Sequence, residues 1–243
     1  MLSSREQSLF QALPIEQTSK GEYREESYFF MSIQEASTPS ILYVHTDPLC
    51  PLAWRTSLWL RSVREQRPLA IQWRLFSLEV VNRKEGTVPD YVNGYGWAAL
   101  RSLALARRLK GNEAFEKLYI ALGNAAHGRK ESIRERAVVE ACAEEAGLGS
   151  DFVGAALADE ATIQEVLDDH EGAVKRYHAF GVPTLALEGS DTGFYGPIIH
   201  TVPIGDAIGE LWDYTAWALR QANLFELKRE RSAATTPWGP VSA

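Results

Sequence analysis

One cysteine stands where the chain changes from a strand-like to a helix-like pattern. Cys50 follows the apolar run at residues 41–45 and is followed directly by Pro51, a residue suited to a first helical turn. The first amides of a helix have no partner within it and carry the positive end of its dipole. Both features favour a thiolate, the nucleophilic form of cysteine. The sequence therefore predicts a reactive thiol with a lowered pKa at Cys50; the alternative is an inert, buried small side chain.

The segments around Cys50 predict a β-α-β unit. Residues 41–45 are β-branched and aromatic and lie between prolines, as in a buried strand. Apolar residues then recur at helical spacing until Pro68, and residues 69–78 alternate between apolar and polar types, which predicts a second strand. This arrangement brings Cys50 to the exit of the first strand.

The rest of the chain predicts mainly helices. Residues 90–179 have a 3.6-residue period broken by glycines, which indicates four or five helices, with Asn112 expected as an N-cap. Strand character returns at residues 181–187 and leads to a hairpin, and residues 205–221 predict a closing helix. Residues 1–39 and 232–243 are expected to be a mobile N-terminal extension and a loose tail.

Composition excludes several classes of protein. The net charge is −7 with no basic block, which argues against nucleic-acid binding. Neither an apolar run of about 20 residues nor a secretory signal is evident, so we expect a cytoplasmic protein without a membrane span. The two cysteines, Cys50 and Cys142, form neither a disulfide framework nor a metal cluster, and no nicotinamide or flavin motif is present.

Two motifs in this order resemble the DsbA-like branch of the thioredoxin superfamily. Asp47-Pro48-Leu49-Cys50-Pro51 resembles its Asp-Pro-x-Cys-Pro-Trp-Cys active-site segment, and Val182-Pro183-Thr184 resembles its cis-proline motif. The resemblance implies an α/β thioredoxin fold over residues 40–231. An all-helical insertion at about residues 90–179 would lie between the second strand and the cis-proline strand. Val182, Pro183 and Thr184 would then bind the substrate or thiol beside Cys50.

Within that branch, the sequence is most similar to the actinobacterial mycothiol-dependent nitroreductases. The resemblance places Asn82 and Tyr91 at the rim of the active site, where they would contact substrate; loop capping is the alternative role. The similar segments are Asp47–Pro51, Val81-Asn82, Pro89-x-Tyr91, Phe194–Pro197, Leu211–Asp213 and Phe225–Arg229.

One departure from the family pattern changes the expected chemistry. Leu52 and Ala53 stand where dithiol members have tryptophan and a second, resolving cysteine, whereas Trp54 remains. A dithiol enzyme releases its mixed disulfide by attack of the second thiol, which alanine cannot perform. We therefore expect a monothiol oxidoreductase in which Cys50 forms a mixed disulfide that mycothiol or glutathione, acting as co-substrate, resolves. The activity could extend to nitro compounds.

The resemblance leaves several alternatives open. A mycoredoxin- or glutaredoxin-like reductant and a homodimer are both compatible with it. The protein could instead be a thiol transferase like kappa-class glutathione transferases and 2-hydroxychromene-2-carboxylate isomerases, in which Cys50 would hold the external thiolate. A thioredoxin-fold protein that binds ligands without catalysis is the third hypothesis.

The remaining candidate residues have both functional and structural interpretations. His45 either tunes Cys50 or packs in the core, and His170 and His178 are expected in the core. His127 and His200 have no evident partner, so no Cys/His/Asp triad is predicted, and no histidine spacing suits a metal. Four aromatic residues either line a groove for a flat ligand or pack in the core: Trp54, Tyr95, Trp97 and Tyr195.

Overall fold

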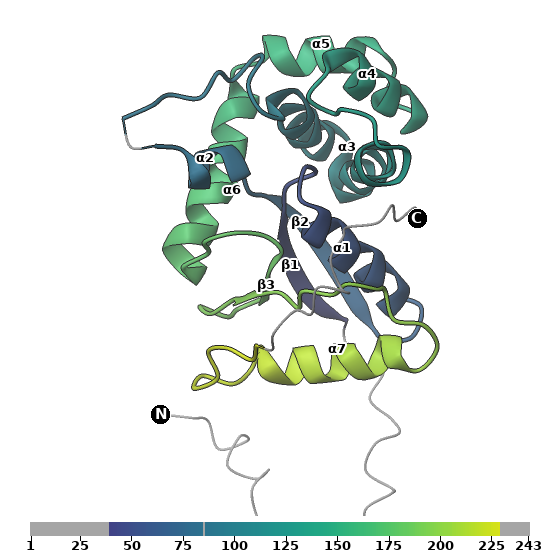
Figure 1. Cartoon of the computed structure of the whole chain (residues 1–243), viewed down its shortest axis with the longest axis vertical. Coiled ribbons are helices and arrows are strands. Elements are labelled where there is room, and N and C mark those ends of the chain that lie inside the picture. Colours follow the sequence, from purple (N-terminus) through teal and green to yellow (C-terminus); the bar gives the residue numbers. More distant parts are fainter. Residues whose placement is uncertain (1–38, 85, 229–243) are drawn as a thin grey trace, which may run out of the picture. The chain divides into compact units, whose positions relative to one another are not determined.

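The computed structural model describes residues 39–84 and 86–228 (Figure 1). Apart from Pro39, the expected N-terminal extension and C-terminal tail lie outside these residues, so those two predictions remain predictions. Within the described ranges, none of the helices combines the length and the apolar character that crossing a membrane requires.

A four-stranded mixed sheet forms the centre of the fold. Its strands are β1 (Ser40–Thr46), β2 (Leu69–Leu75), β3 (Thr184–Leu187) and β4 (Phe194–Tyr195), in the order β2-β1-β3-β4. β1 and β2 are parallel, whereas β3 is antiparallel to both β1 and β4. Helix α1 (Pro51–Val63) connects β1 to β2, which confirms the predicted β-α-β unit. The α/β class and the C-terminal hairpin are also as expected.

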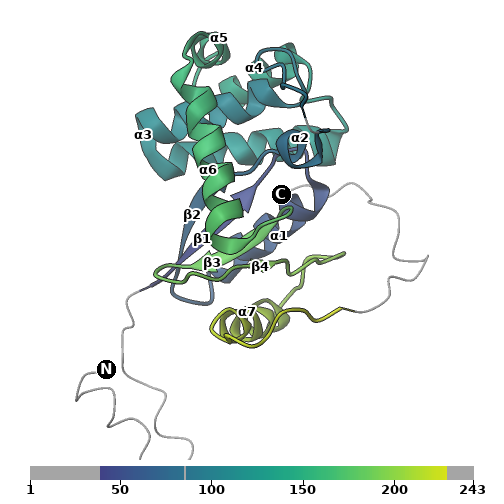
Figure 2. The same ribbon diagram turned by 90° about the vertical axis from the view of Figure 1, so that its left-hand side faces the viewer.

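Helices cover both faces of this sheet. α1 lies on one side, alongside the closing helix α7 (Ala207–Ala218), and α6 (Ala161–Tyr177) crosses the other side (Figures 1 and 2). Side chains on both faces of β1 are consequently buried: Leu42 and Val44 on one face have 0% and 1% of their surface exposed, and His45 on the other has 4%. Cys50 follows this central strand and therefore has a fixed position.

The expected helical insertion lies between β2 and β3. It comprises α3 (Trp97–Gly123), the π-helical segment η2 (Asn124–Arg129), α4 (Arg136–Glu145), α5 (Asp151–Ala158) and α6. α3 is interrupted at Gly111, whose φ of 80° favours glycine. The insertion packs mainly on α3, which in turn contacts β2.

Two local predictions in this region are wrong. The second strand ends at Leu75, because Ser77 starts helix α2 (Leu78–Asn82) and its side chain accepts a hydrogen bond from Val80 N. Asn112 lies inside α3 and is not an N-cap; its side chain forms hydrogen bonds with β2 instead. Its Oδ1 accepts from Trp73 N at 3.0 Å, and its Nδ2 donates to Ile71 O at 2.8 Å. An edge strand leaves such backbone groups unpaired, and no local pattern in the sequence reveals that need.

An aromatic cluster joins the insertion to the sheet and to α1. Tyr119 of α3 lies between Trp54 and Trp73, with ring centroids 5.8 and 5.4 Å away, and its hydroxyl is 2.6 Å from Thr46 Oγ1. Trp54 also packs directly on the backbone of Gly123, where a Cβ atom would overlap its six-membered ring. Trp54 is 1% exposed and has no space to retreat. Gly123 is thus required for the approach of α3 to α1.

We predict that Gly123→Ala destabilises the protein by about 2 kcal/mol, because overpacking a filled core forces side chains and backbone apart. The matched control is Gly172→Ala in α6, where a Cβ meets nothing within 4 Å. That change should be neutral or stabilise by up to about 1 kcal/mol, as alanine favours a helix. Urea unfolding of both variants measures the difference; equal effects would show that the Trp54–Gly123 contact is not constraining.

Candidate active site

Cys50 is the N-cap residue of α1, and its sulfur forms hydrogen bonds with backbone groups. Its Sγ accepts a hydrogen bond from Ala53 N at 3.5 Å and donates to the carbonyl oxygen of Val182 at 3.4 Å. Only 6% of the residue is exposed. In the described residues both cysteines are free, and Cys50 is a thiol held between a helix end and a distant loop.

That distant loop is the predicted cis-proline motif. The Val182–Pro183 peptide bond is cis, and Thr184 Oγ1 donates to Gly181 O at 2.7 Å. The loop is also tied to β4, because Gly196 N donates to Pro183 O at 2.9 Å. The structure therefore brings Val182 and Pro183 beside Cys50 across 132 positions of sequence, as the motif order suggested.

The predicted low pKa of Cys50 is wrong for the protein in this state. Burial raises the pKa of the Cys50 thiol, the nearby Asp47 raises it further, and the amides of Ala53 and Leu52 oppose both effects only in part. The surroundings explain this result, because Cys50 belongs to an apolar cluster rather than to an open cleft. The cluster's buried members are Ala53, Phe76, Ala173, Ala179 and Val182, with Leu52, Leu78, Val81 and Tyr177 packed against it.

Asp47 builds the turn that presents Cys50. Its Oδ1 accepts from Leu49 N at 2.9 Å and its Oδ2 from Leu78 N at 2.8 Å, while its carbonyl accepts from Cys50 N at 2.9 Å. Burial raises the pKa of Asp47 to about 6, against these hydrogen bonds. Asp47 thus connects the turn to α2 on the insertion side of the site.

His127 is a site residue that the sequence did not reveal. Its Nε2 lies 2.9 Å from the carbonyl oxygen of Pro48, and its ring stacks on Trp54 with centroids 6.1 Å apart and an interplanar angle of 27°. Burial lowers the pKa of His127, with Lys130 and Arg55 acting in the same direction and the Pro48 contact opposing. The only available signal was a histidine beside Gly128, which by itself does not indicate a partner 79 positions away.

Asn82 and Tyr91, the expected rim residues, have local contacts in the structure. Asn82 Nδ2 donates to Leu78 O at 2.8 Å, and the Tyr91 ring meets Trp97 edge-on at 4.6 Å. The Tyr91 carbonyl accepts from Arg101 at 2.9 Å. These contacts match the loop-capping alternative, and a role in binding substrate remains a prediction.

The four aromatic residues considered for a ligand groove fall into two buried and two exposed side chains. Trp54 and Trp97 are core residues with 1% and 0% exposure, whereas Tyr95 and Tyr195 are 43% and 37% exposed. Tyr195 lies next to Phe180, with ring centroids 4.9 Å apart, at the cis-proline loop. Of the four, the two tyrosines therefore remain accessible to a ligand.

Of the three histidines with a predicted core position, His45 and His170 are buried, whereas the prediction for His178 is wrong because this residue is exposed. His45 is buried against Tyr177, and burial lowers its pKa to about 4. His170 Nδ1 accepts from Ser77 N at 3.3 Å, and burial lowers its pKa to about 4 as well. His178 ends α6 with a φ of 51°, so it is a helix terminus rather than a core residue.

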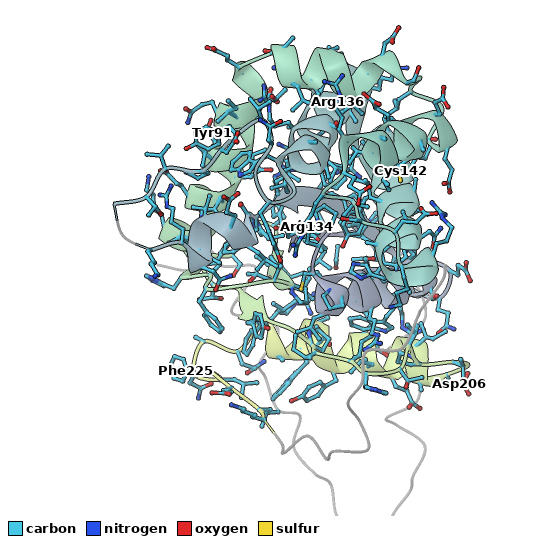
Figure 3. The ribbon with its side chains drawn as sticks, turned by 45° about the horizontal axis from the view of Figure 1, so that its top comes forward. Tyr91, Arg134, Arg136, Cys142, Asp206 and Phe225 are labelled. Carbon is cyan, nitrogen blue, oxygen red and sulfur yellow. The ribbon has the colours of Figure 1, made fainter. Side chains whose placement is uncertain are left out.

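Cys142 does not supply the missing second thiol. It lies on α4 within the helical insertion (Figure 3), is 1% exposed, and has a pKa raised to about 11 by burial. Across residues 39–84 and 86–228, no cluster of three or more histidine, cysteine or acidic side chains is arranged to hold a metal ion.

Comparison with known proteins identifies the family of this chain. Residues 49–229 match the Rv2466c-like family, described as mycothiol-dependent nitroreductase Rv2466c. The uncharacterized protein Rv2286c of Mycobacterium tuberculosis is 34% identical over 192 residues, which is 78% of this chain and 82% of that protein.

Solved structures share the fold at lower identity. A probable DsbA oxidoreductase, SCO1869 from Streptomyces coelicolor, superposes with a TM-score of 0.56 at 19% identity, covering 84% of this chain and 99% of that one. The cytosolic disulfide reductase DsbM from Pseudomonas aeruginosa with GSH gives 0.52 at 18% identity, covering 73% and 99%. The fold is thus that of DsbA-like thioredoxin-superfamily proteins. Because the family match spans most of the sequence, the chain belongs to the Rv2466c-like family of oxidoreductases, described as mycothiol-dependent nitroreductase Rv2466c.

Proposed function

We propose that the protein is a monothiol oxidoreductase in which Cys50 forms a mixed disulfide that a low-molecular-weight thiol resolves. The observation that carries the proposal is the position of Cys50 Sγ, at the start of α1 and 3.4 Å from the carbonyl of Val182, with Ala53 in place of a second thiol. This arrangement supports thiol exchange at Cys50 that depends on an external resolving thiol.

The exchange proceeds in two balanced steps. The Cys50 thiol gives up its proton to water, and the thiolate attacks one sulfur of a disulfide; one S–S bond forms, the original one breaks, and the other sulfur leaves as a thiolate that takes up a proton. An external thiolate then attacks the substrate-derived sulfur of the mixed disulfide; a new disulfide forms outside the protein, the bond to Cys50 breaks, and the Cys50 thiolate leaves and is protonated again. The high pKa of Cys50 leaves few molecules ionised, but each thiolate is a stronger nucleophile than one of low pKa.

Mycothiol or glutathione is the external thiol that the comparisons support. Mycothiol appears in the description of the family, and the fold neighbour DsbM was solved with GSH. Use of such a thiol implies a cytoplasmic location, which is part of the proposal. The proposal also includes a mycoredoxin- or glutaredoxin-like reductant and a homodimer. Reduction of aromatic nitro compounds is proposed from family membership alone.

Incubation with oxidised mycothiol or oxidised glutathione should add one thiol to the protein, at Cys50. Intact-mass spectrometry measures the adduct, and the Cys142→Ser variant, which lacks a buried thiol on α4, should form it equally. An excess of the reduced thiol should remove it. An unmodified wild-type protein would contradict the proposal and favour the non-catalytic binding alternative.

Ala53→Cys should restore a dithiol site. Because Ala53 N is 3.5 Å from Cys50 Sγ, the introduced thiol lies within one helical turn and should resolve the adduct. We expect the adduct to fall about tenfold and the protein to lose two hydrogen atoms as a disulfide forms between Cys50 and the introduced thiol. Mass spectrometry would contradict a thioredoxin-type site if the adduct persisted without bridging.

A second candidate, a thiol transferase, is favoured by the hydrogen bond from Cys50 Sγ to the carbonyl oxygen of Val182. An S–H group that donates to Val182 O could instead donate to the thiolate of a bound mycothiol or glutathione, which would then be the nucleophile. Cys50 would remain unmodified throughout the reaction.

Cys50→Ser separates the two candidates, because serine keeps a hydrogen-bond donor but cannot form a disulfide. Disulfide reduction should fall at least about 100-fold if Cys50 is the nucleophile. Conjugation of the thiol to an electrophilic chloroaromatic should stay within about tenfold of wild type if Cys50 only donates a hydrogen bond. Retained disulfide reduction in this variant would rule out the monothiol cycle.

A further inference from the structure

The carbonyl of Pro48 needs a donor from outside its own turn. Pro48 is buried, and the carboxylate and carbonyl oxygens of the preceding Asp47 already accept hydrogen bonds from backbone N–H groups. His127 Nε2 meets that carbonyl at 2.9 Å. Since a carbonyl oxygen only accepts, His127 must hold its proton on Nε2, and its lowered pKa keeps the ring otherwise neutral near pH 7.

The His127 ring has a fixed place in the insertion. It stacks on Trp54, which also packs on Tyr119 and on the bare backbone of Gly123, four residues before His127. The segment η2 that carries it is π-helical. This geometry is rare in proteins, and where it does occur it often lies at a functional site. From this segment the His127 ring reaches Trp54 of α1.

We propose that His127 is a positioning residue for Cys50, acting through the hydrogen bond from its Nε2–H to the Pro48 carbonyl. The turn it holds is short: Cys50 N donates to Asp47 O at 2.9 Å, so the orientation of the Pro48 peptide determines where Cys50 starts α1. The opposite side of the turn is held by Leu78 N on Asp47, and Leu49 packs against Gly96. His127 thus completes the support of the thiol from the insertion.

Loss of this bond should have two opposite effects on Cys50. A loosened turn admits water, which relieves the burial that raises the pKa of Cys50. The titratable groups that face the thiol are Asp47 of its own turn, Tyr119 of α3 and Tyr177 of α6. Alkylation by iodoacetamide at pH 7 should therefore become faster. Exchange with a disulfide should become slower, because it needs Sγ aligned beside Val182.

The test compares His127→Phe, which keeps a ring on Trp54 without a donor, with His127→Gln, which keeps a donor at the Nε2 position without the ring. His127→Phe should raise the alkylation rate of Cys50 and lower its rate of mixed-disulfide formation with oxidised mycothiol, each on the order of fivefold. His127→Gln should stay within about twofold of wild type in both. The midpoint of the pH profile of alkylation should shift to lower pH in the Phe variant only.

His200→Phe is the matched control, since His200 is exposed and its Nδ1 meets the hydroxyl of the neighbouring Thr201. Wild-type rates in His127→Phe, or a Gln variant that behaves like Phe, would overturn the proposal. If His127→Phe fails to fold, nitrogen NMR of wild-type His127 decides: the Nε2–H tautomer supports the hydrogen bond, and the Nδ1–H tautomer overturns it.

The inference rests on the proposed role of Cys50 as the reacting thiol, and the two fail differently. A wild-type protein whose Cys50 neither alkylates nor exchanges would remove the proposed function. A reactive wild type whose His127→Phe variant is equally reactive would leave that function standing and remove only the role of His127.

Discussion

The contact between Trp54 and Gly123 determines how the two parts of the fold meet. The Trp54 ring packs directly on the helix backbone at Gly123, so α3 lies close to α1. The hydroxyl of Tyr119 in α3 forms a hydrogen bond with Thr46 Oγ1 at the end of β1. From there the chain continues into η2, whose His127 reaches the Pro48 carbonyl. The helical insertion therefore contacts the segment that carries Cys50, at Thr46 and at Pro48.

Much of this fold could be predicted because its signals are local. The β-branched run before Cys50, the proline after it and the alternation of β2 each reflect one element's own needs, and the two motifs indicated the fold family by resemblance. The positions of Asn112 and His127 could not be predicted in this way. Each satisfies a backbone group of a distant segment, β2 in one case and the Pro48 turn in the other.

The state of Cys50 shows the same limit in electrostatics. A helix start next to cysteine predicts a thiolate, and the amides of Ala53 and Leu52 do lower its pKa. The apolar residues that raise the pKa come from Phe76, α6 and the cis-proline loop, so their combined burial of the sulfur is a property of the tertiary structure. Burial thus favours the thiol over the thiolate, and the sulfur lies 3.4 Å from the carbonyl oxygen of Val182.

The pH dependence of iodoacetamide labelling of Cys50, in the Cys142→Ser background, tests this account most directly. If burial dominates the helix end, the labelling rate should still be rising above pH 8.5, the pKa of an ordinary thiol being about 8.5. A rate that has already reached its maximum well below neutrality would show that Cys50 is a thiolate and would contradict the account.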